Sequence, residues 1–180
     1  MLFISLTLYS QTFEKIGPYT VWFNYQTKIT ENVKYTVKGP LIHLKRKGIF
    51  YKSNGTVLSS DYTNSGYDKG HMYPCDLAQS YSDMHASFNL KNSVPQDPSL
   101  NRGLWKVLES RVSKLTKTND SIQVMIDIYG LKEMKGKLYV PLYFTKQLKI
   151  WNDGTFIIET YTFKNENPIY TAIDYYKVKN

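Results

Sequence analysis

One segment near the middle of the chain has a helical repeat, and strand-like segments lie before and after it. Apolar residues recur every three or four positions over residues 99–117, which predicts a helix there. The repeat consists of Leu104, Leu108, Val112 and Leu115, and Pro98–Ser99 supplies a suitable start. Residues 19–25, 33–39, 122–130, 137–144, 155–163 and 169–178 are rich in β-branched and aromatic residues and predict strands. One dominant helix among many strands predicts an α+β fold rather than alternating βα units.

Turn signals divide these segments. A polar turn is expected around Thr30–Asn32, and MKG at 134–136 and NDG at 152–154 mark turns between the later strands. SNG at 53–55 and TNSG at 63–66 bracket a short extended piece. The residues that follow, 68–71, are therefore expected to leave a loop and enter a strand.

The chain of 180 residues fits one domain with its own core. Its first residues, MLFISLTLYSQ, form an apolar run that lacks preceding basic residues and is too short to span a bilayer. Residues 1–12 are either the remnant of a signal peptide, which we favour, or a first strand; residues 13–180 form the domain. The first alternative predicts a secreted or periplasmic protein. Nothing else in the sequence resembles a membrane segment, so no membrane partner is expected.

An excess of basic residues gives a net charge of +8 and a pI near 9.3. A field of this sign favours polyanionic partners such as nucleic acid, although it also serves solubility alone. The 16 tyrosines suit strands, wet interfaces and base stacking alike. The single cysteine, Cys75, excludes a disulfide within the chain and a zinc site built from cysteines.

The stretch GYDKGHMY (66–73) holds one of only three histidines. The imidazole of His71 titrates near neutrality and could take a proton from water, or it could be a structural residue in a polar turn. His43 and His85 lack comparable neighbours in the sequence. A nucleophilic Cys75 is a weaker alternative, because nothing around it marks an activated thiolate.

A second concentration of polar residues, KNSVPQDPSLNRGLWKVLES (91–110), leads into the predicted helix. On a regular helix, Asn101 and Glu109 would be separated by about 80° and about 12 Å. Asn101 could then bind a divalent cation such as Mg²⁺ while Glu109 reaches its water shell, because Mg²⁺ keeps several waters. The alternative makes Asn101 a helix cap and Glu109 a solvent-facing charge.

The chain resembles the DNA/RNA non-specific endonuclease family of ββα-metal nucleases. The resemblance rests on SGYDKGHMYP (65–74), SFNLKNSVPQ (87–96) and LNRGLWKVLE (100–109), in that order, with weaker similarity over most of the rest. It implies the ββα-metal (His-Me finger) fold, a central, mostly antiparallel sheet with a catalytic helix. It also implies that His71 is the general base, that Asn101 is the direct Mg²⁺ ligand, and that Glu109 holds metal-bound water. Mn²⁺ is the expected substitute metal.

Further roles follow from the same resemblance. Asn92 matches a polar residue that lines the site, and Gln96 a supporting one. Arg46 is the candidate for an upstream arginine that contacts phosphate. Lys69 stands where the family usually has arginine; it keeps the charge but loses the bidentate fork. Ser113 stands where an arginine is common, and Arg111 or Lys114 could substitute for it.

The implied activity is metal-dependent hydrolysis of phosphodiester bonds in DNA and RNA without sequence preference, leaving 5′-phosphates. The partners would be DNA and RNA, bound through the phosphate backbone, and the resemblance leaves room for a homodimer and an inhibitor protein. The alternative is a catalytically weakened nuclease fold that mainly binds nucleic acid, with Lys69 and Ser113 as signs of lost activity.

Overall fold

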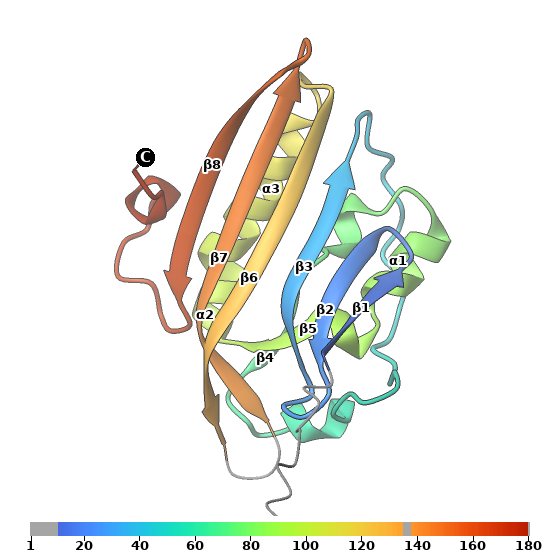
Figure 1. Cartoon of the computed structure of the whole chain (residues 1–180), viewed down its shortest axis with the longest axis vertical. Helices are drawn as coiled ribbons and strands as arrows, with labels where there is room; N and C mark the ends of the chain where they lie inside the picture. The colour runs from blue at the N-terminus through green and yellow to red at the C-terminus, as the bar shows by residue number, and fades with distance from the viewer. Residues whose placement is uncertain (1–10, 135–137, 180) are drawn as a thin grey trace, which may run out of the picture.

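A six-stranded antiparallel sheet forms one layer of the protein (Figure 1). The computed structural model describes residues 11–134 and 138–179. The strand order is β1-β2-β3-β6-β7-β8, and every neighbouring pair is antiparallel. The bounds are β1 Gln11–Ile16, β2 Tyr19–Asn24, β3 Ile29–Val37, β6 Ser121–Glu133, β7 Tyr139–Asn152 and β8 Thr155–Lys164. The predicted α+β class is confirmed.

The segments between β3 and β6 form a second layer behind the sheet (Figure 1). A short antiparallel pair, β4 (Asp68–His71) and β5 (Ser93–Gln96), lies beside the long helix. That helix has three parts: α2 (Pro98–Leu100), a π-helical turn η4 (Asn101–Trp105) and α3 (Lys106–Leu115). The remaining helices are α1 (Tyr81–Ser87) and the 3-10 turns η1 (Ser59–Tyr62), η2 (Cys75–Leu77), η3 (Leu90–Asn92) and η5 (Ile173–Tyr176).

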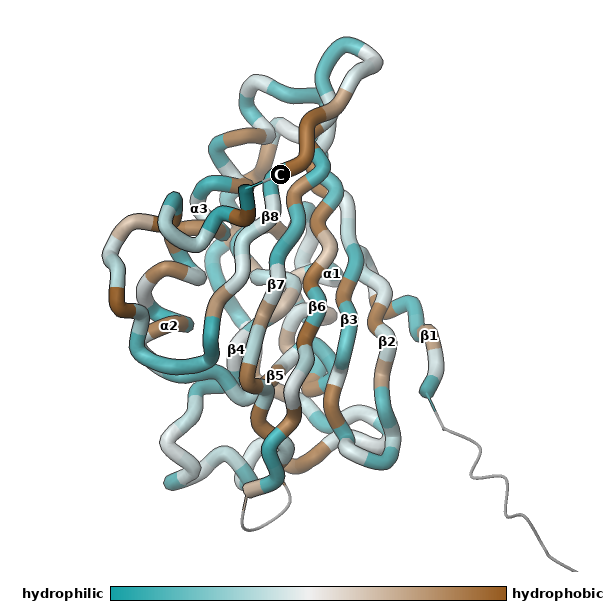
Figure 2. Tube along the Cα trace, turned by 60° about the vertical axis from the view of Figure 1, so that its left-hand side comes forward, coloured by the Kyte–Doolittle hydropathy of each residue, from teal (hydrophilic) through white to brown (hydrophobic). Residues whose placement is uncertain are grey.

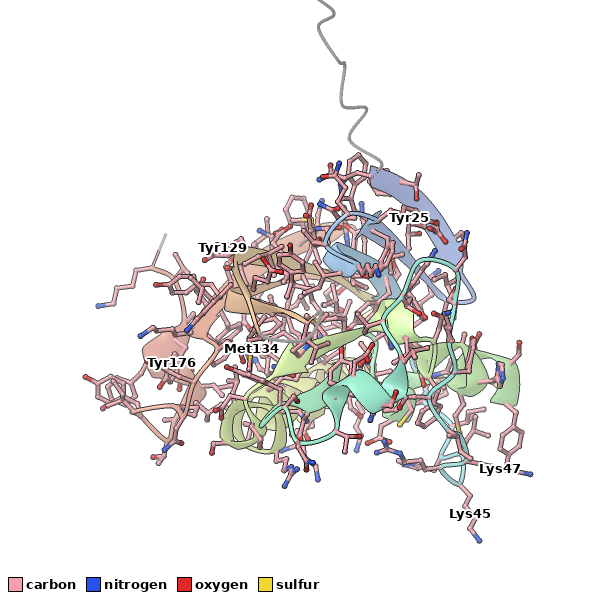
Figure 3. All side chains as sticks on the ribbon, turned by 90° about the horizontal axis from the view of Figure 1, so that it is seen from below. Tyr25, Lys45, Lys47, Tyr129, Met134 and Tyr176 are labelled. Atoms are coloured by element: carbon pink, nitrogen blue, oxygen red, sulfur yellow. The ribbon has the colours of Figure 1, made fainter. Side chains whose placement is uncertain are left out.

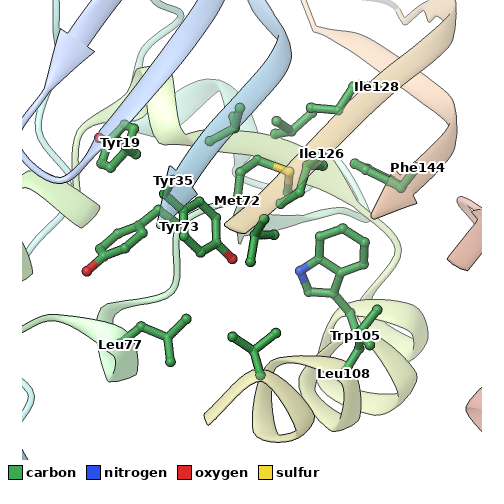
Figure 4. Packing of buried hydrophobic residues seen from close by; sticks show 14 of the residues in the cluster. Tyr19, Tyr35, Met72, Tyr73, Leu77, Trp105, Leu108, Ile126, Ile128 and Phe144 are labelled. Atoms are coloured by element: carbon green, nitrogen blue, oxygen red, sulfur yellow. The ribbon is translucent and has the colours of Figure 1, made fainter. Parts of the chain in front are cut away.

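The main core lies between the sheet and the long helix. Alternate residues of β6, from Ile122 to Ile128, are buried, and the residues between them are more exposed. Figure 2 shows hydrophobic residues interspersed with hydrophilic ones along the central strands. Trp105 and Leu108 are fully buried against the sheet, where the Trp105 ring lies 5.5 Å from that of Phe144 (Figure 4). The buried face of the sheet, formed by every second residue, therefore packs against the face of α3 on which apolar residues recur at helical spacing.

Two sequence predictions of local structure are wrong. The turn expected around Thr30–Asn32 lies inside β3; the chain turns earlier, where Lys28 has a φ of 57°. The strand expected over residues 169–178 is replaced by η5, with a single bridge from Lys177 to Tyr161. Side-chain packing accounts for the difference, because the Tyr176 ring stacks on Phe163 at 4.9 Å. Tyr176 thus covers part of the edge strand β8 through its ring.

Of the remaining predictions of local structure, some are confirmed and others fall on residues that the structure does not describe. The strand at 68–71 and the NDG turn, with positive φ at Asp153 and Gly154, are confirmed. Residues 1–10 and 135–137 lie outside the described residues. Of the predicted leader or first strand at 1–12, the structure describes only residues 11 and 12, which belong to β1. Of the predicted MKG turn, it describes only Met134. Within the described residues, no helix has the length and apolar character needed to cross a bilayer.

Glu159 on β8 connects α3 of the second layer with the C-terminal segment. Its carboxylate accepts hydrogen bonds from Arg111 Nη2 at 2.6 Å, Lys177 Nζ at 3.0 Å and the Tyr161 hydroxyl at 3.0 Å. Although burial opposes ionisation, these donors and the Arg111 charge together lower the pKa of Glu159 to about 2. The group therefore stabilises the fold while it is ionised.

We expect Glu159→Gln to lower the free energy of unfolding at pH 7 by about 2 kcal/mol, because it removes the buried charged acceptor of Arg111, Lys177 and the Tyr161 hydroxyl. Since the folded pKa is depressed, the stabilisation is complete above the unfolded pKa of about 4.3 and disappears as pH falls through the folded value. Urea unfolding at pH 7, 4 and 2.5 measures this difference. Glu166→Gln, which removes an exposed carboxylate paired with Lys164, is the matched control and should cost less than about 0.5 kcal/mol. Equal losses from the two variants would contradict this role.

Candidate active site

A cleft of about 650 Å³ lies beside β4 and the start of the long helix. It brings together residues that are far apart in the sequence. Arg46, Lys69, His71, Asn101 and Glu109 line it, together with Asp68, Asp76 and several aromatic residues. Five of the six residues proposed from sequence for catalysis or metal binding therefore share one cavity, and their chemical roles stay predictions.

β4 places His71 at the edge of the cleft. Asp68 to His71 pair with Gln96 to Ser93 in β5, which fixes the backbone on both sides of the imidazole. Gly70 is needed in this pair, because a Cβ there would lie 2.2 Å from Gln96 Oε1. The imidazole packs against the rings of Phe50 at 4.8 Å and Phe88 at 5.2 Å, and these two rings also contact each other at 5.5 Å.

The electrostatic surroundings keep His71 neutral. Burial, together with the nearby Arg46 charge, lowers the pKa of His71 to about 4. Its Nε2 atom is buried and, within the described residues, has no hydrogen-bond partner. A buried polar atom without a partner is costly in a structure that serves packing alone. The imidazole is therefore available to accept a proton at neutral pH.

Asp68, which sequence analysis left without a role, orients Asn101. Asn101 Nδ2 donates to Asp68 Oδ2 at 2.9 Å, and Arg102 grips the same carboxylate with Nε at 2.8 Å and Nη2 at 2.6 Å. Because a carboxylate only accepts, the amide nitrogen must face it, and the amide oxygen Oδ1 must point away. Arg102 is also the largest of the causes that lower the pKa of Asp68.

The long helix is not regular between Asn101 and Glu109. The π-helical turn η4 separates them, and Gly103 inside it has φ −98° and ψ −112°, outside the helical region. The separation calculated for a regular helix therefore does not apply, although both residues do line the cleft. Asn101 is not the N-cap either; Asp97 takes that position and accepts from the backbone of Ser99 and Leu100.

Glu109 is accompanied by a buried lysine that sequence analysis missed. Lys146 on β7 is fully buried, and its Nζ atom lies 3.7 Å from the centre of the Trp105 ring. Within the described residues Nζ has no hydrogen-bond acceptor. Burial raises the pKa of Glu109, and the Lys146 charge opposes that rise. A signal existed in the sequence: Lys146 occupies the inward register of β7, between Phe144 and Leu148, where an apolar residue is expected.

Lys69 and Arg46 place positive charge at the cleft against aromatic rings. Lys69 Nζ lies 5.4 Å from the Tyr62 ring and 5.6 Å from the Phe50 ring. The Arg46 guanidinium lies 5.5 Å from the Phe88 ring. These contacts position the cations without neutralising them, because ring faces attract cations but carry no net charge.

Asn92 and Gln96 do not line the cleft, which corrects the expectation for Asn92. Asn92 is fully buried; its Nδ2 donates to the carbonyls of Tyr73 and Ser87 at 2.8 Å, and its Oδ1 accepts from Tyr73 N at 2.8 Å. It therefore braces the chain that follows His71. Gln96 is fully buried beside Gly70, and the supporting role expected for it stays a prediction.

A larger hollow of about 790 Å³ continues the cleft along α3 and shares Asp76, Lys106 and Glu109 with it. Ser113 and Lys114 both line this hollow. Arg111 is held by Glu159 on another side of the helix. Of the two proposed substitutes for the missing arginine, only Lys114 is thus on the cleft side.

The thiol alternative receives no support from the surroundings of Cys75. The side chain lines the cleft, but burial raises the pKa of Cys75 to about 11. The thiolate, which is the nucleophilic form, is therefore disfavoured at neutral pH.

The donor set suits a hard divalent cation held by few protein ligands. No group of three or more His, Cys, Asp or Glu side chains that could hold a metal occurs within residues 11–134 and 138–179. The cleft instead offers the Asn101 amide oxygen and the carboxylates of Glu109 and Asp76. Oxygen ligands in small number are what Mg²⁺ uses, because it keeps several waters.

Comparisons with known proteins agree with this geometry. The chain is 35% identical over 88 residues to a nuclease of Nostoc sp., a match that covers 47% of this chain and 32% of the relative. It is 35% identical over 87 residues to mitochondrial endonuclease G of Bos taurus, which covers 47% of this chain and 29% of the relative. The matched part thus spans about a third of these curated relatives.

The fold agrees as well. The crystal structure of the EndoG/EndoGI complex matches 93% of this chain and 80% of the chain compared, with a TM-score of 0.81 and 22% identity, which establishes the ββα-metal nuclease fold. The sequence pattern of the family described as DNA/RNA non-specific endonuclease matches residues 8–179. With nearly the whole chain matched, the protein belongs to the DNA/RNA non-specific endonuclease family.

Proposed function

We propose that the protein is a metal-dependent endonuclease that hydrolyses phosphodiester bonds of DNA and RNA without sequence preference. The observation that carries this proposal is the neutral His71, whose buried Nε2 has no partner within the described residues, in one cleft with Asn101 and Glu109. Membership of a nuclease family supports it. The individual roles below are proposals for this chain.

His71 accepts a proton from the attacking water. Its neutral form persists at physiological pH because burial and Arg46 disfavour the imidazolium. Phe50 and Phe88 hold the ring in place, so that little reorientation is needed before proton transfer.

Lys69, Arg46 and Lys106, which all line the cleft, bind the scissile phosphate. The two lysines contribute point charges rather than a bidentate fork, so they attract the phosphate without fixing its rotation. Contacts of this kind address the backbone and carry no base information, which accounts for cleavage without sequence preference.

Asn101 and Glu109 would hold the metal, Asn101 directly and Glu109 through water. Mg²⁺ is the proposed ion, and Mn²⁺ is expected to replace it because it takes the same oxygen ligands. When bound, such an ion stabilises the charge that develops on the phosphoryl and leaving oxygens. Asp68 fixes the Asn101 amide, and Lys146 compensates part of the Glu109 charge inside the protein.

Digestion of plasmid DNA and total RNA, each with Mg²⁺, with Mn²⁺ and with EDTA, tests the function. We expect both polymers to be cut with either ion and neither with EDTA. The catalytically weakened alternative predicts a gel shift of both polymers without cutting under every condition, and that result would contradict the proposal. A homodimer, an inhibitor protein and a secreted or periplasmic location stay predictions.

We expect the acid limb of kcat/KM to be set by Glu109 rather than by His71. Burial raises the pKa of Glu109, so its carboxylate becomes protonated at a higher pH than an ordinary carboxyl does, and the protonated form no longer binds metal-bound water. Because protons and Mg²⁺ compete for this group, raising Mg²⁺ should move the limb to lower pH. His71, with a pKa of about 4, stays neutral throughout. A limb near pH 6.5 that ignores the Mg²⁺ concentration would instead show an ordinary titrating histidine.

A further inference from the structure

A basic segment, HLKRK at residues 43–47, precedes Gly48. A separate hollow of about 610 Å³ lies between this basic segment and α1; we call it the side hollow. Its lining consists of Lys45, Arg46, Lys47, Gly48, Tyr81 and His85. Arg46 also lines the catalytic cleft, so the two cavities adjoin at this residue. Figure 3 shows Lys45 and Lys47 projecting outward from this side of the molecule.

The basic segment is held against the protein by specific contacts. Lys47 N donates to Met84 Sδ at 3.2 Å, which ties the segment to α1. Gly48 lies directly on the Phe88 ring, since a Cβ there would come within 2.3 Å of two ring atoms. The side hollow is therefore formed before any ligand arrives.

Flat aromatic surfaces form the opposite wall. The His85 ring stacks on Tyr51 with centroids 4.6 Å apart and planes at 16°, so Tyr51 covers one face of the imidazole. Tyr81 leaves 59% of its surface exposed, and both Tyr81 and His85 line the hollow. Exposed rings of this kind give bases a surface on which to stack.

Charge and shape together indicate the ligand. Exposed lysines at 45 and 47 attract anions, as any basic surface would. The acidic side chains of an Asp- or Glu-rich peptide would use these charges but have no ring to cover the aromatic surfaces. A nucleic-acid strand supplies a phosphate and a base in each nucleotide, and a strand whose phosphate lies in the cleft can pass Arg46 into the side hollow.

We propose that the side hollow binds a nucleotide next to the scissile phosphate, with its base on the two rings and its phosphate at the two lysines. This inference rests on the proposed nuclease function, because the side hollow would bind the part of the substrate strand that leaves the catalytic cleft. Bases are free to stack in this way only where the strand is unpaired, so the site favours single-stranded segments.

The test is fluorescence anisotropy in EDTA, where no cleavage is expected, with a labelled single-stranded DNA hexamer and a hexamer of the same phosphates without bases. Tyr81→Ala should weaken binding of the normal hexamer about tenfold and leave the abasic hexamer unchanged. Tyr81→Phe should bind both as the unmodified protein does. Lys45→Ala/Lys47→Ala should weaken both hexamers and reduce the slope of log K against log salt by about 1.4.

Lys15→Ala/Lys34→Ala is the matched control. Both lysines are exposed and face Thr20 from neighbouring strands on the open side of the sheet, so the variant removes the same charge away from the cleft. It should leave the difference between the two hexamers and the salt slope unchanged.

Three results would decide against the proposal or its basis. An equal effect of Tyr81→Ala on both hexamers would overturn the stacking site. A polyaspartate competitor as strong as the hexamer, and equally sensitive to Tyr81→Ala, would overturn it in favour of an acidic protein partner. Base-dependent binding by a protein that cuts neither plasmid nor RNA would support the side hollow and contradict the proposed nuclease function.

Discussion

His71→Ala is expected to lower kcat on plasmid DNA by about a thousandfold, because it removes the only imidazole among the described residues that line the cleft, and general-base catalysis contributes about 10² to 10⁴ in rate. KM and hexamer binding in EDTA should change little, since His71 contributes no charge to the bound phosphate at neutral pH. Steady-state kinetics and anisotropy together measure these effects. Loss of binding in parallel with kcat would mean that His71 holds the substrate instead.

The aromatic surroundings of His71 allow a sharper control. Removing the His71 side chain leaves a space beside the Phe50 and Phe88 rings, whose centres lie 4.8 and 5.2 Å from the imidazole. Added imidazole should therefore restore part of the activity of His71→Ala, with a dependence on the concentration of its neutral form. The same addition should leave the activity of Asn101→Ala unchanged. Absence of rescue, with the variant still folded by thermal unfolding, would argue against proton transfer as the role of His71.

The fold was largely predictable because its signals are periodic. Buried Ile122 to Ile128 alternate along β6, and the helical repeat of α3 points one face to the sheet. The failures arose where a tertiary contact overrides a local preference. Residues 169–178 have strand composition, yet Tyr176 packs its ring on Phe163 instead of pairing along the backbone. Local propensity decides the structure of such a segment only when packing leaves the choice open.

The sequence predicted the chemical groups of the site better than it predicted the residues that hold those groups in place. The motifs identified the groups that now line one cleft, including His71, Asn101 and Glu109. The sequence could not show that Asn92 is buried in the interior, because an asparagine has the same sequence signal whether its amide is buried or lines a cleft. Nor could it pair Asp68 with Asn101 and Arg102, because that contact depends on how β4 meets the kinked helix. Lys146 is the exception, as its inward register is visible in the strand pattern.

Asn101→Ala is expected to lower kcat about a thousandfold and to abolish tight Mn²⁺ binding, because it removes the only direct metal ligand proposed for the cleft. Asp68→Ala should cost about 10- to 100-fold, the usual effect of losing a residue that orients a ligand. Without Asp68, the Asn101 amide can turn and present nitrogen instead of oxygen to the cation. Asp68→Asn should retain more activity, since its amide oxygen can still accept from Asn101 Nδ2.

The double variant Asp68→Ala/Asn101→Ala tests whether Asp68 acts only by orienting Asn101 or has a role of its own. If Asp68 acts through Asn101, the double variant should be no worse than Asn101→Ala alone, because the oriented group is already absent. Mn²⁺ binding, followed by electron paramagnetic resonance, gives a readout that does not depend on turnover. Arg102→Ala removes the other partner of Asp68 and serves as the comparison; its guanidinium is exposed and does not contact Asn101 through any hydrogen bond of the described residues. Additive losses of Asp68 and Asn101 would place Asp68 in direct contact with metal or substrate, and the hydrogen bond at 2.9 Å would then be incidental to catalysis.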